Sequence, residues 1–96
     1  MKLAELNEAF GFLSFKAMER LVDELKPVFP QYKPRVGVHM DRGYDFPVLQ
    51  VTVPRTVPPQ DLIDFIDQLD WVVPGGVGPV SRRKNGYSIK WYMNKA

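Results

Sequence analysis

The 96-residue chain contains no cysteine and only one histidine. The lack of cysteine excludes disulfide bonds, thiol nucleophiles and thiolate metal sites together. No apolar stretch approaches the roughly 20 residues that a helix needs to cross a bilayer. The first residues include acids where a secretory signal needs an apolar run. These absences favour a cytoplasmic protein, of a cell or of a virus-infected host, with no membrane partner.

Acidic residues are missing from the last part of the chain. Residues 1–70 carry eight Lys or Arg and eleven Asp or Glu, a balance of −3, whereas residues 71–96 carry five Lys or Arg and no acid, a balance of +5. A domain polarised in this way can meet an anionic partner on one side. Ordinary solvated surface explains the same distribution, so both interpretations stay open at this point.

The composition is that of one ordinary globular domain. The chain is 45% hydrophobic and 25% charged, and its length suits a single domain over residues 1–96. A chain of this size buries about 60–65% of the surface that it exposes when unfolded. One modest core without covalent cross-links is therefore expected.

Three segments have the periodicity of helices. Residues 3–10 predict a short helix that stops at Gly11. Ser14 is a good N-cap for a second helix, which Pro27 ends, and Pro59 suits the start of a third. The apolar stripes that we expect to face the core are Met18, Leu21, Val22 and Leu25 in the second helix, and Leu62, Phe65, Ile66 and Leu69 in the third.

Four segments alternate like half-buried strands. Residues 35–40 and 46–53 flank a turn around Gly43 and predict an antiparallel hairpin. Residues 80–84 and 87–93 flank Asn85-Gly86, a strong signal for a two-residue type I′ turn. Residues 29–34 and 74–79 are expected to form an extended linker and a glycine-rich loop.

The element order α(α)ββαββ predicts an α+β fold of two layers. The expected architecture is an antiparallel four-stranded sheet with helices on one face. If the last strand lies beside the first hairpin, the arrangement would be a circular permutation of a ferredoxin-like βαββαβ sheet.

Patterns that would support catalysis or a cofactor are weak. His39 shares a strand face with Asp41, but no further group is placed to converge on a general base. The aspartates of the third helix, spaced by three, wind around it instead of converging on a metal ion. Segment 74–79 lacks the lysine and the following helix of a phosphate-binding loop. We therefore expect no enzymatic activity, no cofactor and no metal.

The basic turn at residues 82–84 is the most informative segment for binding. Next to it, Lys90 and Tyr92 occupy the strand face opposite the predicted core face. The first hairpin would add cations and an aromatic anchor if it lies alongside. The predicted contact residues are Arg82, Arg83, Lys84, Lys90, Tyr92, Arg35, Arg42 and Tyr44.

Two classes of partner fit these residues. The leading hypothesis is a non-enzymatic protein-binding module, an adaptor or a stoichiometric inhibitor of the kind that viruses encode, which acts through the polarised surface and the basic hairpin. The alternative is a domain that binds DNA or RNA, with residues 82–84 on the phosphates and aromatic rings on the bases. A homo-oligomer is a third possibility.

Overall fold

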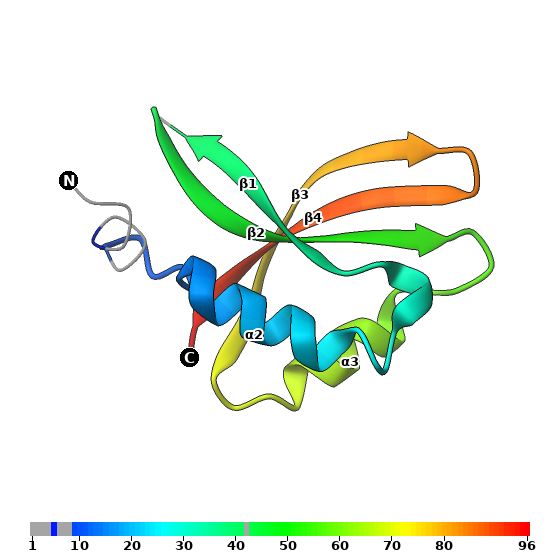
Figure 1. Ribbon diagram of the computed structural model, residues 1–96, viewed down its shortest axis with the longest axis horizontal. Coiled ribbons are helices and arrows are strands. Elements are labelled where there is room, and N and C mark those ends of the chain that lie inside the picture. Colours follow the sequence, from blue (N-terminus) through cyan, green and yellow to red (C-terminus); the bar gives the residue numbers. More distant parts are fainter. Residues whose placement is uncertain (1–4, 6–8, 42) are drawn as a thin grey trace.

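The computed structural model describes Glu5, residues 9–41 and residues 43–96. The helix expected over residues 3–10 falls for the most part outside these described residues, as does Arg42. In chain order the elements are α2 (Phe15–Leu25), the 3₁₀ turn η1 (Pro30–Tyr32), β1 (Arg35–Asp41), β2 (Tyr44–Pro54), α3 (Gln60–Asp67), β3 (Val72–Arg83) and β4 (Gly86–Lys95) (Figure 1).

Residues next to α2 and α3 explain where each helix begins. The Ser14 Oγ accepts a hydrogen bond of 3.2 Å from the Ala17 N–H and so caps α2, as predicted. α2 ends at Leu25, two residues before Pro27. α3 starts directly after Pro59, and Asp61 places a carboxylate in its first turn, where the helix dipole favours negative charge.

The sheet has the strand order β1-β2-β4-β3, and every neighbouring pair is antiparallel. β2 and β3 are therefore parallel to each other, with β4 between them, and α3 connects them. A β-bridge between Phe12 and Asn94 brings the start of α2 to the end of β4. Joining those two points would create a second unit of the same kind, from β4 through α2 to β1 around β2. The predicted circularly permuted ferredoxin-like arrangement is thus confirmed.

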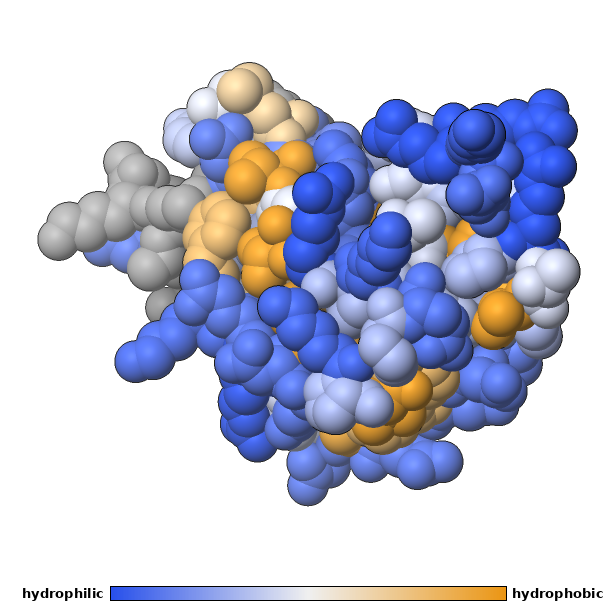
Figure 2. All heavy atoms as spheres, turned by 45° about the vertical axis from the view of Figure 1, so that its right-hand side comes forward, coloured by the Kyte–Doolittle hydropathy of each residue, from blue (hydrophilic) through white to orange (hydrophobic). Residues whose placement is uncertain are grey.

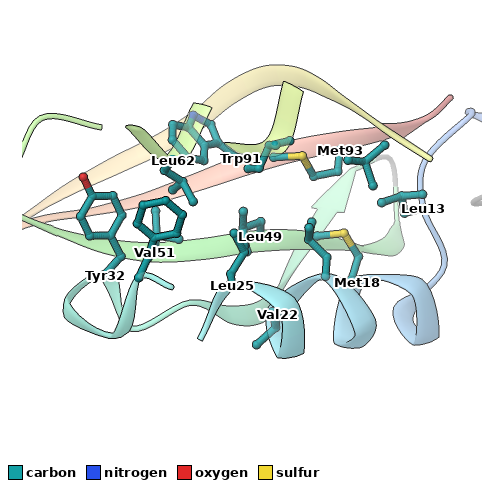
Figure 3. Close-up of a cluster of buried hydrophobic side chains, with 14 of the residues drawn as sticks. Leu13, Met18, Val22, Leu25, Tyr32, Leu49, Val51, Leu62, Trp91 and Met93 are labelled. Atoms are coloured by element: carbon teal, nitrogen blue, oxygen red, sulfur yellow. The ribbon is translucent and has the colours of Figure 1, made fainter. Parts of the chain in front are cut away.

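The core lies between the sheet and the two helices. Met18, Leu21 and Leu25 of α2 are fully buried, and Leu62 and Ile66 of α3 are buried beside them. Figure 3 shows Met18 and Leu25 of α2 pointing toward the strands β2 and β4. The strand residues in this cluster are Leu49, Val51, Val53, Val72, Trp91 and Met93. Among the helices that the structure describes in full, α2 and α3 cover this face and neither lies on the opposite face, which we name the helix-free face.

Two segments expected to be irregular are more ordered than predicted. Residues 29–34 contain η1, and Tyr32 is fully buried rather than exposed in a linker. Residues 74–79 belong to β3, which continues through them with register shifts between Pro74 and Val77 and between Val77 and Val80. Glycines in a strand mark such bulges, and the sequence pattern did not separate a bulged strand from a loop.

The turn between β3 and β4 lies one residue earlier than predicted. Arg83 pairs with Gly86, so Lys84 and Asn85 form the turn, and neither has the positive φ of a type I′ turn. A Cβ on Gly86 would overlap the backbone oxygen of Val53. Gly86 is therefore glycine because β2 approaches it closely, not because it occupies the turn.

Candidate binding surfaces

The basic residues at the β3–β4 turn form the first candidate surface. Arg82, Arg83 and Lys84, which we name the basic tip, are all exposed. Figure 2 shows hydrophilic residues gathered over this end of the hairpin. None of the three makes an ion pair with a residue in the described part of the chain, where Arg20–Glu24 on α2 is the ion pair observed. The aspartates of α3 do not neutralise the basic tip, so its charge is open to a partner.

Arg55 extends this surface and was missed by the sequence analysis. Its backbone N–H donates to the Asn85 oxygen at 3.4 Å, which places the residue beside the basic tip, and its side chain is exposed. Arg55 lies about 30 residues from the tip in the sequence. Only the pairing of β2 with β4 brings them together, and no local pattern reports that pairing.

An apolar strip lies next to the basic tip. Val77 and Val80 of β3 pair with Trp91 and Ile89 of β4, so their side chains share the face that carries the core. Neither is covered by a helix, since Val77 is 59% exposed and Val80 is 55% exposed. Tyr87 of β4, opposite Arg82, continues the same row and is partly exposed. We name Val77, Val80, Ile89 and Tyr87 the apolar strip.

The apolar strip leads into a groove between α3 and β3. The groove has a volume of about 190 Å³ and begins at Val77. Its floor is formed by Trp91 and Met93 of β4. The remaining lining residues are Ile63, Ile66, Pro74 and Gly75. A hollow of this size lined by apolar side chains can hold one aliphatic or aromatic side chain of a partner.

The helix-free face of the sheet carries a separate polar surface. Arg35, Gln50 and Lys90 lie opposite one another on β1, β2 and β4 and form one row across it. Arg35 is exposed, whereas Lys90 is half-buried and donates from Nζ to the Val38 oxygen at 3.4 Å. Arg35 and Lys90 therefore lie on the same face of the sheet, two strands apart, with Gln50 between them.

Tyr92 lies in an aromatic cluster on the same face. Its hydroxyl is 3.4 Å from His39 Nδ1, and its ring is 5.8 Å from that of Phe46. The rings of Phe12 and Phe46 stack with centroids 4.6 Å apart, and Phe46 is buried. The ring of Tyr92 is consequently packed against other rings of this cluster. Less of its surface is accessible to a partner than if the residue stood alone on the strand.

The eight predicted contact residues do not form one patch. Tyr44 is 45% exposed, but it starts β2 at the end of the sheet opposite the basic tip (Figure 1). Arg42 lies outside the described residues. Arg82, Arg83 and Lys84 lie together at one end, and Arg35 and Lys90 lie across the middle of the helix-free face. The residues therefore belong to at least two surfaces.

The one histidine of the chain lies within the aromatic cluster of the helix-free face. The His39 ring packs against Phe46 and Tyr92, with centroids 5.0 and 5.2 Å away. Within residues 5, 9–41 and 43–96, no group of three His, Cys, Asp or Glu side chains could hold a metal ion. In the same residues, no helix is long and apolar enough to cross a membrane.

No protein-family model, curated protein or solved structure matches this chain.

Proposed function

We propose that this chain is a non-enzymatic protein-binding module whose contact surface is the apolar strip and groove beside the basic tip. The observation that carries the proposal is the exposure of Val77 and Val80 on the core-facing side of β3, where no helix covers them. Exposed apolar side chains that continue into a hollow and are rimmed by charge are typical of protein interfaces.

The charges around the surface define the kind of partner. The basic tip flanks the strip at one end, next to Tyr87. At the other side of the groove, Asp67 follows the lining residue Ile63 by one helical turn on α3 and is exposed. A peptide segment with an apolar side chain for the groove and acidic residues toward the basic tip complements this arrangement.

A displayed library of random peptides tests this proposal without knowledge of the natural partner. We expect selection on the immobilised protein to enrich segments with one large apolar residue flanked by Asp or Glu. Val77→Glu places a carboxylate at the mouth of the groove and should weaken binding at least about tenfold, equal to about 1.4 kcal/mol. Val77 is exposed, so this variant should still fold.

Lys16→Glu on the exposed side of α2 is the matched control and should leave peptide affinity unchanged. Reversal of the basic tip in Arg82→Glu/Arg83→Glu/Lys84→Glu should slow association and remove the preference for acidic peptides. If no peptide is enriched, or if the enriched peptides bind Val77→Glu as well as the parent protein, the proposal is wrong.

Nucleic acid is the second candidate, favoured by the row of Arg35, Gln50 and Lys90 on the helix-free face. The stacking of Phe12 on Phe46 leaves few free rings for bases, which weakens this candidate. Titration of labelled single-stranded DNA and RNA distinguishes the two. Binding that falls steeply with salt and is weakened by Arg35→Ala/Lys90→Ala and by Arg82→Ala/Arg83→Ala/Lys84→Ala, but not by Val77→Glu, would support nucleic acid instead.

A further inference from the structure

β1 and β3 are the two edge strands of the sheet, and their free edges differ. β3 contains Pro74 and Pro79 and pairs with two register shifts, which hinder the addition of another strand. β1 has seven residues, no proline and no register shift against β2. The edge of β1 is therefore the one at which a further strand can pair regularly.

The pairing with β2 determines which backbone groups of β1 project from that edge. Asp41 and Tyr44 flank the two-residue turn, a position that forms a hydrogen-bonded pair in such hairpins. Bonded and non-bonded pairs alternate, so Val38 opposite Pro47 is a non-bonded position, in agreement with the missing N–H of proline. Val38 and its neighbours at positions 36 and 40 consequently direct their N–H and C=O groups to the free edge.

The side chains at the same positions form an apolar row. Val36 packs partly against the core, whereas Val38 is 52% exposed and Met40 is 67% exposed. In Figure 2 hydrophobic residues gather over the end of the β1–β2 hairpin. A regular edge with exposed apolar side chains favours strand pairing.

We infer that two copies of this chain pair through β1 in an antiparallel dimer, which joins the two sheets into one. In the register centred on Val38, the positively charged start of β1 in each copy faces the negatively charged end of β1 in the other copy. The two-fold symmetry gives two such charge pairs. The apolar residues of the row meet one another between these ends. The facing pairs are Arg35 with Asp41, Val36 with Met40, Gly37 with His39, and Val38 with Val38.

This register also matches the backbone groups. The residues that direct N–H and C=O groups outward face one another, so each such pair can exchange both hydrogen bonds. If the register shifted by one residue, backbone groups that point outward in one copy would face backbone groups that point inward in the other. Arg35 would also no longer face Asp41. Lys90 donates to the Val38 oxygen at 3.4 Å, but a carbonyl oxygen has a second lone pair for the partner strand.

Sedimentation equilibrium of the full chain and its variants tests the dimer. We expect the parent protein to be dimeric, and Arg35→Glu alone or Asp41→Arg alone to raise the dimer dissociation constant at least about tenfold, because like charges then face each other. An equimolar mixture of the two single variants should restore the dimer, since every facing charge pair is then of opposite sign.

Val38→Pro gives an independent test, because it removes the outward N–H without removing a donor from the ladder with β2. It should also dissociate the dimer, while Lys16→Glu on α2 should not. Circular dichroism checks that each variant is folded. A parent protein that stays monomeric at millimolar concentration would overturn the inference, and so would a dimer that neither charge reversal weakens.

Discussion

The packing of a neighbouring strand explains why residue 86 is glycine. Its position on β4 faces Pro54 at the end of β2, and the backbone of β2 leaves no space for a side chain there. The sequence pattern attributed this glycine to the turn. The structural reason is contact between strands that are distant in the sequence, which a local pattern does not reveal.

Gly86→Ala should destabilise the protein by about 1–3 kcal/mol, because the added Cβ meets backbone that cannot rotate away. Gly76→Ala in β3 is the matched control. Its added Cβ would have Tyr92 Cδ2 as the nearest atom at 3.8 Å, so stability should change by less than about 0.5 kcal/mol. Urea unfolding of both variants measures the difference, and equal stabilities would contradict this explanation of Gly86.

Tyr32 is the buried polar residue that links η1 to the segment before α3. Its hydroxyl donates to the Pro58 oxygen, and the residue is fully buried. Burial raises the pKa of Tyr32 above the ordinary value of 10.0, and the negative charge of Asp61 raises it further. The unfolded chain therefore releases this proton at lower pH than the folded protein, so this group lowers stability as pH rises above 10.

Tyr32→Phe should cost about 1 kcal/mol at pH 7 through the lost hydrogen bond. As pH rises above 10, the parent protein should lose stability faster than this variant, so that the difference narrows. Thermal unfolding between pH 7 and pH 11 measures it, with Tyr87→Phe as the exposed control. A difference that stays constant over this range would contradict the role of burial.

The elements themselves follow closely from the sequence where the signals are local. Ser14 predicted the start of α2, and the apolar stripe of that helix is the buried one. β1 and β2 also match their predicted ranges to within two residues. Prediction failed at β3, where prolines and glycines suggested a loop. Pairing with β4 keeps that segment extended, and tertiary pairing is not visible in local propensity.

The candidate site could be predicted only in part for the same reason. The basic tip is contiguous in the sequence and was found. Arg55 and the exposure of Val77 depend on strand order and on where α3 ends, so the sequence could not indicate them. The stacking of Phe12 on the buried Phe46 likewise joins segments that are distant in the sequence, so no local pattern indicates it.

Ser14→Ala removes the cap of α2 and should lower the free energy of unfolding by about 1 kcal/mol. The reason is that the Ala17 N–H then lacks its partner in the first turn. Ser81→Ala, at an exposed position in β3, is the matched control and should be close to neutral. Chemical denaturation followed by circular dichroism measures both, and a neutral Ser14→Ala would show that α2 does not depend on this cap.

For the molecule as a whole, the connectivity predicts that the protein tolerates circular permutation. The Lys95 N–H donates to the Gly11 oxygen at 2.8 Å, so the end of β4 adjoins the segment before α2. A permutant that is cut between Lys84 and Asn85, and in which a short flexible linker joins Ala96 to Gly11, has the order βαββαβ. We expect it to fold cooperatively with an unchanged circular dichroism spectrum. An unfolded permutant would contradict the strand order β1-β2-β4-β3.

The separation of acidic and basic side chains within the molecule follows from its two layers. The acidic side chains of α3 belong to the helix layer, and the basic tip projects from the end of the sheet. The apolar strip lies between them, uncovered, on the core-facing side of β3 and β4. The central claim is that this strip contacts a protein.

Photo-crosslinking from position 80 tests that claim most directly. A photoreactive residue in place of Val80 should give a protein adduct in a lysate of the source cells, and Val77→Glu should abolish it. The same residue in place of Lys16 on α2 should give no such adduct. A crosslink to nucleic acid from position 80, or equal protein yields from positions 80 and 16, would contradict the claim.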